Sequence, residues 1–434
     1  MSAHQPHESS IGIIGTGIAG MGCAYFLRKK YDVTLYERND YVGGHTNTVT
    51  VDEDGLEVPI DTGFMVYNEV TYPNLVRLFK ELNVETKNSS MSFSVQHIPS
   101  GLEFCGSSLN HLFAQRKNLF NPRFIRMLMQ IDRFNGECVE VLENERFASY
   151  TLQEYVNEKG FGGDMLMKYL VPMSSAVWST PPDQMLKFPA VTLVRFFRNH
   201  GFLGLNTQHQ WKTVVGGTRS YRDKLISSFR SRIKIGNPAV KIFRNNGKAE
   251  IRFADGTRVR HDKVILACHG DEALRLLEKP TRDERRLLGE FKYQHNSATV
   301  HADASVMPKT RMAWSSWNYR LDVNNKGRIA PSTVYYMNSL QQVSKKRDYF
   351  VSIDDPGIVD PRLILRTIDY THPIFSLGAM NAQKELPLLN NGGPVYYCGS
   401  YFKYGFHEDA FTSALDLCRV IAGEDIWPAN KEAA

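Results

Sequence analysis

Apolar residues near the start of the chain follow a strand pattern, then a helical spacing, then a strand pattern again. Residues 11–14 form a first apolar run, a stretch with helical spacing continues through Lys30, and residues 33–36 form a second apolar run. Two short apolar runs separated by one amphipathic segment are typical of a strand–helix–strand unit.

The remaining pattern predicts a chain of mixed class. Residues 48–60 alternate around an Asp-Gly turn, which indicates a β-hairpin, and a helix is expected from Pro73 through Leu82. The other expected elements are a mostly helical stretch over 107–200, a helix through 221–226, short strands between 234 and 267, a separate sheet over 296–370, a strand at 395–397, and a helix over 408–421. The predicted fold class is α/β, with a Rossmann-type parallel sheet and a second α+β domain.

Glycines at the end of the first strand carry the first chemical signal. Gly15, Gly17 and Gly20 have the spacing of a dinucleotide-binding turn, and Glu37 ends the second strand. Gly15 would allow the tight turn, Gly17 would let the backbone approach a pyrophosphate, and Gly20 would let helix and strand pack closely. Glu37 would accept hydrogen bonds from ribose hydroxyls. The helix start would offer its N–H groups to the phosphates.

The segment after Glu37 distinguishes between cofactors. Arg38 is followed by Gly43, Gly44 and His45. This pattern resembles the flavoprotein form of the motif, in which a second glycine pair lies against the cofactor's phosphates. FAD is therefore favoured over NAD.

Length, charge and cysteine usage exclude several classes. A chain of 434 residues suits two domains, and a net charge of +6 does not indicate nucleic acid binding. The six cysteines lack paired or metal-ligand spacing, so reduced thiols in a cytoplasmic protein and no metal site are expected. No apolar run reaches the length of a membrane span, and the first ten residues lack the apolar segment of a signal peptide.

Two segments interleave basic and aromatic residues. They span residues 112–134 and 193–205. A helix of this composition can lie on an anionic membrane surface, or it can bury its apolar face in the core and leave its arginines in solvent. Peripheral contact with an anionic membrane is thus one of two open interpretations.

Separated motifs over nearly the whole chain resemble one superfamily. They include GGHTNTV, DTGFMVYNEVTYPNL, VWSTPP, FPAVTLVRFFRNHG, VVGGTRSY and YGFHEDA. The chain resembles the flavin monoamine oxidase type of FAD protein, and within it a group usually labelled predicted NAD/FAD-binding proteins. Some relatives of that group are associated with cyclopropane-fatty-acid-synthase-like methyltransferases and with desaturation of fatty acyl chains.

The resemblance implies an FAD site and a domain division. The expected cofactor contacts are Gly15, Gly17, Ile18, Ala19, Gly20, Glu37, Arg38, Gly43, Gly44, His45, Thr46, Val240, Gly399, Ser400, Phe406 and His407. No cysteine precedes Gly405 at the attachment spacing, so the FAD should be non-covalent. The FAD domain is expected over 1–95, 205–290 and 390–434, and the substrate domain over 96–204 and 291–389. Asp61-Thr62-Gly63 either packs on the cofactor or forms a purely structural turn.

The chain departs from amine oxidases where the chemistry occurs. The stretch 295–298 lacks the lysine that usually holds a water near the flavin, and Phe406 has no hydroxyl. The candidate catalytic residues are His407, Tyr401, Tyr404 and His295, although a histidine is more often structural.

Three functions remain open. The first is desaturation of a fatty acyl or lipid-like substrate by hydride transfer to the flavin, in a long apolar cavity that opens near 112–134 and 193–205 with arginines at its mouth. The second is a soluble amine oxidase that produces hydrogen peroxide. The third is a flavin-binding protein without turnover.

Overall fold

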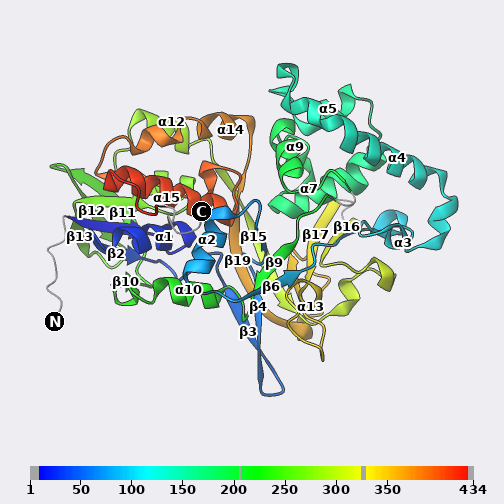
Figure 1. Ribbon diagram of the computed structural model, residues 1–434, viewed down its shortest axis with the longest axis horizontal. Helices are drawn as coiled ribbons and strands as arrows, with labels where there is room; N and C mark the ends of the chain where they lie inside the picture. Colours follow the sequence, from blue (N-terminus) through cyan, green and yellow to red (C-terminus); the bar gives the residue numbers. More distant parts are fainter. Residues whose placement is uncertain (1–8, 205–206, 324–328, 429–434) are drawn as a thin grey trace.

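The computed structural model describes residues 9–204, 207–323 and 329–428. A parallel sheet with its helices occupies one end of the molecule, a mixed sheet lies in the middle, and a helical region covers the other end (Figure 1). The prediction that the first ten residues are not a signal peptide concerns mainly residues 1–8, which lie outside the described ranges. The predicted domain limits at 205 and 434 also lie outside them.

The predicted strand–helix–strand unit is present at the start of the parallel sheet. Its elements are β1 (Ser10–Ile14), α1 (Ile18–Leu27) and β2 (Asp32–Tyr36). With β10 (Ile233–Lys234), β14 (Lys263–Leu266) and β20 (Val395–Tyr397), the strand order is β10-β2-β1-β14-β20. Every neighbouring pair is parallel, which confirms the Rossmann-type sheet. Its strands come from three separate stretches of the chain.

Helices cover this sheet. The last long helix, α15 (His407–Ala422), packs closely beside α1, since a Cβ at Gly22 would lie 3.0 Å from the ring of Phe411. The other covering helices are α10 (Arg219–Ile226), α11 (Gly270–Leu276), α12 (Arg282–Leu288) and α14 (Leu377–Gln383). Because α1 directly follows β1, it begins at the carboxyl ends of the parallel strands.

Three of the short strands expected between 234 and 267 form an antiparallel sheet of their own. They are β11 (Ala239–Asn245), β12 (Lys248–Phe253) and β13 (Arg258–His261). A further small sheet joins β5 (Tyr67–Asn68), β9 (Trp211–Val214) and β6 (Thr86–Ser89). The predicted hairpin is confirmed as β3 (Thr48–Glu53) and β4 (Leu56–Asp61), followed by α2 (Pro73–Glu81).

The separate sheet expected over 296–370 is confirmed and is larger than predicted. It contains β15 (Lys292–His301), β16 (Trp317–Val323), β17 (Ile329–Tyr336), β18 (Phe350–Ile353) and β19 (Ile364–Ile374). It also includes β7 (Phe93–His97) and β8 (Leu102–Cys105), because β7 pairs in parallel with β16. The boundary predicted between residues 95 and 96 falls inside β7. The two-domain division itself stays a prediction.

The mostly helical stretch over 107–200 is also confirmed. Its helices are α3 (Leu109–Leu112), α4 (Pro122–Glu137), α5 (Leu152–Glu158), α6 (Gly163–Met165), α7 (Val171–Trp178), α8 (Pro182–Met185) and α9 (Ala190–Asn199), and the short α13 (Met337–Leu340) lies elsewhere. None of the helices in the described part of the chain has the length and apolar character needed to cross a bilayer.

Candidate active site

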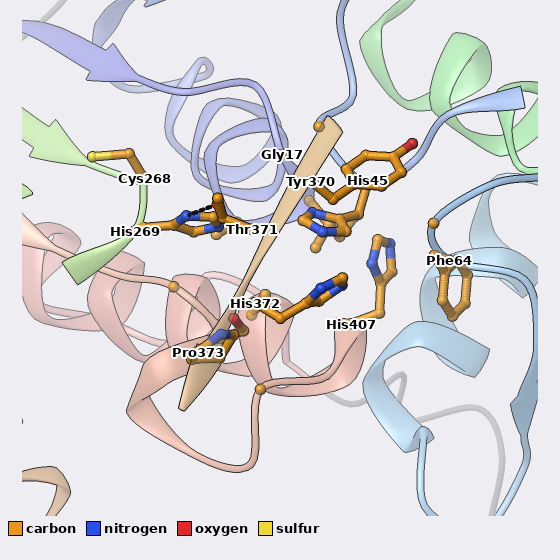
Figure 2. Close-up of a pocket in the computed structure, with 18 of the residues that line it drawn as sticks. Gly17, His45, Phe64, Cys268, His269, Tyr370, Thr371, His372, Pro373 and His407 are labelled. Carbon is orange, nitrogen blue, oxygen red and sulfur yellow. Dashed lines mark hydrogen bonds between the residues drawn. The ribbon is translucent and has the colours of Figure 1, made fainter. Parts of the chain in front are cut away.

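A cavity of about 930 Å³ lies between the parallel sheet and β19. Its walls come from the β1–α1 turn, the end of β2, the residues after β14, strand β19 and the start of α15. These segments are far apart in the sequence, and Figure 2 shows the rings of His45, His372 and His407 close together beside Tyr370. Ligands of open α/β sheets bind at the carboxyl ends of the strands, where this cavity lies.

The glycine turn has the form of a phosphate cradle. A Cβ atom added to Gly17 would meet nothing within 4 Å, whereas one added to Gly20 would lie 2.0 Å from the Gly15 carbonyl oxygen. Gly44 lies alongside, since its added Cβ would be 3.3 Å from the Gly17 Cα. The first N–H groups of α1 have no partner within the helix, so the open space above Gly17 faces free donors.

Glu37 is buried at the end of β2 and braces this turn. Its Oε2 accepts hydrogen bonds from the backbone N–H (3.0 Å) and the hydroxyl (2.6 Å) of Thr16, and its Oε1 accepts one from the Asn39 N–H (3.0 Å). The carboxylate also lines the cavity. Next to it, Arg38 forms an ion pair with Glu272 (2.5 Å), and Val240 lines the same end.

The other predicted cofactor residues divide into lining and supporting positions. Those that line the cavity are Gly15, Gly17, Ile18, Ala19, Glu37, Arg38, Gly44, His45, Val240, Gly399, Ser400, Phe406 and His407. Gly20, Gly43 and Thr46 lie behind that surface. Thr46 is buried, and its Oγ1 hydrogen-bonds the Tyr221 hydroxyl (2.5 Å). The list as a whole stays a prediction.

His407 is held by neighbours rather than free to turn toward a ligand. Its Nε2 is 2.5 Å from the Tyr221 hydroxyl, and its ring stacks on Phe64 at a centroid distance of 3.9 Å (Figure 2). Burial lowers the pKa of His407 to about 3, so the ring is neutral at pH 7 and shares a hydrogen bond with the Tyr221 hydroxyl. His407 thus has a structural partner at its Nε2.

The other catalytic candidates occupy different environments. Tyr401 lines the cavity but is only 1% exposed and packs against Phe291. Tyr404 is absent from the cavity lining within the described residues, and its carbonyl accepts from the Trp178 indole (3.3 Å). The side chain of His295 is 64% exposed and lies 3.5 Å from Asp369. These four residues do not converge on one point.

Sequence reasoning missed a group of side chains on β19. Tyr370 stacks on His45 at 4.7 Å, and the ring of His372 lies 5.2 Å from that of His45. Both line the cavity, together with His269 and Phe64 (Figure 2). The period of two in β19 places Tyr370 and His372 on one face, and this alternation was the available signal. Which face meets the cofactor motifs depends on tertiary structure.

The Asp61-Thr62-Gly63 turn is both structural and part of the cavity wall. Asp61 is fully buried, and its carboxylate accepts from Thr218, Thr48 and Gln341. Gly63 lines the cavity, and a Cβ there would lie 2.4 Å from the His45 carbonyl oxygen. The turn is thus structural through Asp61, and its packing on the cofactor stays a prediction.

The far end of the cavity is aromatic. Its lining includes Met91, Trp178, Phe196, Phe202, Trp211, Trp317, Tyr335, Phe375 and Phe406. Phe406 stacks on Phe196 at 4.9 Å. Of the two basic-aromatic segments, 193–205 contributes Phe196 and Phe202, whereas no residue of 112–134 lines the cavity. Arginines were expected at the mouth of the cavity, near these two segments. This expectation is wrong: in the described part of the chain the lining arginines are Arg38 and Arg275, and both lie at the end opposite the aromatic residues.

These features fit an FAD cofactor. The open space above Gly17 suits a pyrophosphate, and the buried Nε2 of His45 has no partner among the described residues and can bond a ligand. A family model described as flavin containing amine oxidoreductase matches residues 18–304. The chain belongs to this family. It is an FAD-dependent oxidoreductase, and the bound flavin supplies the acceptor for a hydride.

Similar proteins include enzymes of several substrate classes. A stretch of 89 residues is 38% identical to 15-cis-phytoene desaturase of Synechococcus elongatus, and this match spans 19% of the chain and 18% of that enzyme. Among solved structures, putrescine oxidase bound to putrescine is 15% identical, with a TM-score of 0.67 over 96% of this chain and 99% of that one. A fatty acid isomerase from P. acnes, which produces CLA, is 13% identical with a TM-score of 0.66 over 95% and 98%.

The FAD should be released when the purified protein is denatured. Cys268 is the one cysteine among the described lining residues, and it lies beside the Arg38–Glu272 pair rather than near Gly405. Acid precipitation should therefore leave the yellow colour in the supernatant. Colour that stays with the precipitate, confirmed by a flavin mass on a tryptic peptide, would contradict a non-covalent cofactor.

The apo protein should lose stability as pH falls below about 6.5. Burial lowers the pKa of His200, His301 and His372 to about 4 each and that of His407 to about 3. In the unfolded chain these histidines take up protons near pH 6.5, whereas in the folded protein they stay neutral until about pH 4. Their contribution to the free energy of unfolding is therefore complete above about pH 6.5 and decreases as the pH drops towards 4.

Urea denaturation of the apo protein across this range would measure the effect. His200→Phe should make the decline shallower, because it removes one of the buried rings that stays neutral in the fold. A free energy of unfolding that is flat or rises towards pH 5 would contradict the prediction.

Proposed function

We propose that the protein dehydrogenates a fatty acyl or similarly long apolar chain, with FAD as the hydride acceptor. The aromatic end of the cavity carries this proposal. Its side chains offer a large apolar surface beyond the cofactor cradle. Burying acyl methylenes there contributes about 0.8 kcal/mol per CH₂.

The positions of the acidic residues in the cavity lining favour an apolar substrate over a cationic one, because none of them faces the aromatic end. Glu37 and Glu272 are engaged at the opposite end of the cavity, and Asp369 faces His295 with a side chain that is 73% exposed. No other carboxylate lines the cavity in the described part of the chain. An ammonium group in the aromatic end would lack a counter-charge, and a buried unpaired charge is costly.

Amine oxidation is the second candidate, because aromatic rings can hold an ammonium group and a putrescine oxidase shares the fold. Two other similar proteins are named for phytoene and for a fatty acid, which indicates the substrate class to test first. In anaerobic mixing experiments, oleic acid and oleoyl phospholipid should bleach the flavin and gain a double bond. Bleaching by putrescine or benzylamine, with none by the acyl probes, would assign the protein to amine oxidation.

A membrane contact is proposed at the surface of residues 109–129. The apolar side chains of Phe120 (89% exposed), Met129 (68%) and Leu109 (67%) face outward there, among Arg116, Lys117, Arg123 and Arg126. The inner face of α4 buries Phe124, Met127 and Phe134, so only the outer residues remain free to enter a lipid surface. The cytoplasmic location stays a prediction.

Liposomes that contain phosphatidylglycerol should float the protein at low salt, and neutral liposomes should float less of it. Phe120→Ser should reduce flotation, whereas Val420→Ser, which changes an exposed apolar residue on α15, should not. Equal recovery on neutral and anionic vesicles, or no effect of Phe120→Ser, would contradict the proposed contact.

A further inference from the structure

A chain of hydrogen bonds leads from the end of β18, across β15, to a histidine of the edge strand β19 in the cavity wall. Asn296 on β15 is 1% exposed, and its Nδ2 donates to Asp354 Oδ2 (2.6 Å) and to the Ser179 carbonyl (3.1 Å). Its Oδ1 lies 2.7 Å from Nδ1 of His372. The chain therefore runs Asp354–Asn296–His372 and ends at an imidazole in the cavity wall.

The two acceptors decide which way the Asn296 amide faces. If the amide were reversed, its oxygen would point at a carboxylate and a carbonyl, and both contacts would be repulsive. The Oδ1 must therefore face His372. A carbonyl oxygen only accepts hydrogen bonds, so His372 Nδ1 carries the proton and donates it.

This assignment leaves a lone pair on His372 Nε2. A neutral imidazole has one protonated nitrogen, and Nε2 has no partner among the described residues. His372 lines the cavity beside His45, and Phe375, which directly follows β19, lines the aromatic end. The lone pair thus lies where the cofactor cradle and the aromatic end meet.

The two residues that accept hydrogen bonds from Asn296 both have unusual backbone conformations. Asp354 has φ 55° and Ser179 has φ 50°, a region that non-glycine residues adopt infrequently. Asp354 is fixed further by the Ser297 N–H, which donates to its Oδ1 (2.9 Å). Strained residues of this kind persist where the surrounding structure holds them, and they concentrate at functional sites.

We propose that His372 Nε2 is the catalytic base and that Asn296 is a positioning residue that sets its tautomer. This inference rests on the proposed dehydrogenation. Two C–H bonds break and one C=C bond forms, the hydride carries both electrons to the FAD, and the second hydrogen leaves as a proton on His372 Nε2. The neutral state is favoured because burial and the nearby His269 lower the pKa of His372 to about 4.

The tautomer can be measured in the apo protein without any substrate. Long-range ¹H–¹⁵N correlation spectra of protein labelled at histidine should show His372 protonated at Nδ1, with the signal assigned by its loss in His372→Gln. Asn296→Ala should shift the signal towards the Nε2-protonated form. A wild-type signal protonated at Nε2 would overturn the proposal, whichever substrate the enzyme uses.

Reduction of the bound flavin provides the second arm. Base catalysis contributes about 10²–10⁴-fold, so His372→Gln should slow flavin reduction by the productive substrate by this factor, and Asn296→Ala should slow it less. Both should keep FAD bound. His209→Gln is the control, since that ring contacts the Asn199 carbonyl away from the cavity. An unchanged rate in His372→Gln overturns the proposal, whereas acyl probes that never bleach the wild-type flavin would refute the proposed function instead.

Discussion

Gly17→Val should abolish FAD binding while the apo protein stays folded. An added side chain at Gly17 meets no protein atom within 4 Å, and the backbone there is extended, with φ −61° and ψ 174°. A valine therefore fits the apo structure. Its methyl groups would occupy the space above the start of α1, which the pyrophosphate needs.

Gly20→Ala is the matched comparison for this variant. Its Cβ would lie 2.0 Å from the Gly15 carbonyl oxygen, so the apo protein itself should be destabilised. Flavin absorbance after reconstitution would measure binding, and thermal unfolding of both apo variants would measure folding. A Gly17→Val protein that retains FAD, or that unfolds as Gly20→Ala does, would contradict this account of the turn.

Asp61→Ala should lower the free energy of unfolding by at least about 3 kcal/mol, because it leaves several buried donors without an acceptor. The carboxylate accepts from the Thr218 N–H (2.9 Å), the Thr218 hydroxyl (2.8 Å), the Thr48 hydroxyl (2.5 Å) and the Gln341 amide (2.5 Å). These contacts join the β3–β4 hairpin to the start of α10 and to α13.

Asp52→Ala provides the control on the same hairpin, because Asp52 is exposed and its carboxylate is 3.4 Å from the Gly55 N–H. Its effect on stability should stay within about 0.5 kcal/mol. Urea denaturation of the apo proteins would give both values. If the two variants had equal stability, Asp61 would not have the joining role that its hydrogen bonds indicate.

Local sequence was sufficient to predict the elements of the candidate cofactor cradle. The spacing of Gly15, Gly17 and Gly20 between two short apolar runs predicts a turn and its open space, since each requirement is met within a few residues. The strand alternation over 296–370 and the helix after Gly405 were predictable for the same reason. Strands β7 and β8 were not, because β7 is completed by β16, which lies far along the chain.

The choice among histidines shows where sequence reasoning ends. His407, next to a motif glycine, is an evident candidate from sequence, yet Tyr221 and Phe64 hold its ring. His372 stands in a strand without a motif, and its proposed chemistry comes from Asn296 on β15 and from Asp354, which directly follows β18. The sequence by itself determined the cofactor turn, because a turn's geometry depends on adjacent residues. Only tertiary structure decided which imidazole has a free lone pair, because a tautomer depends on partners that meet through space.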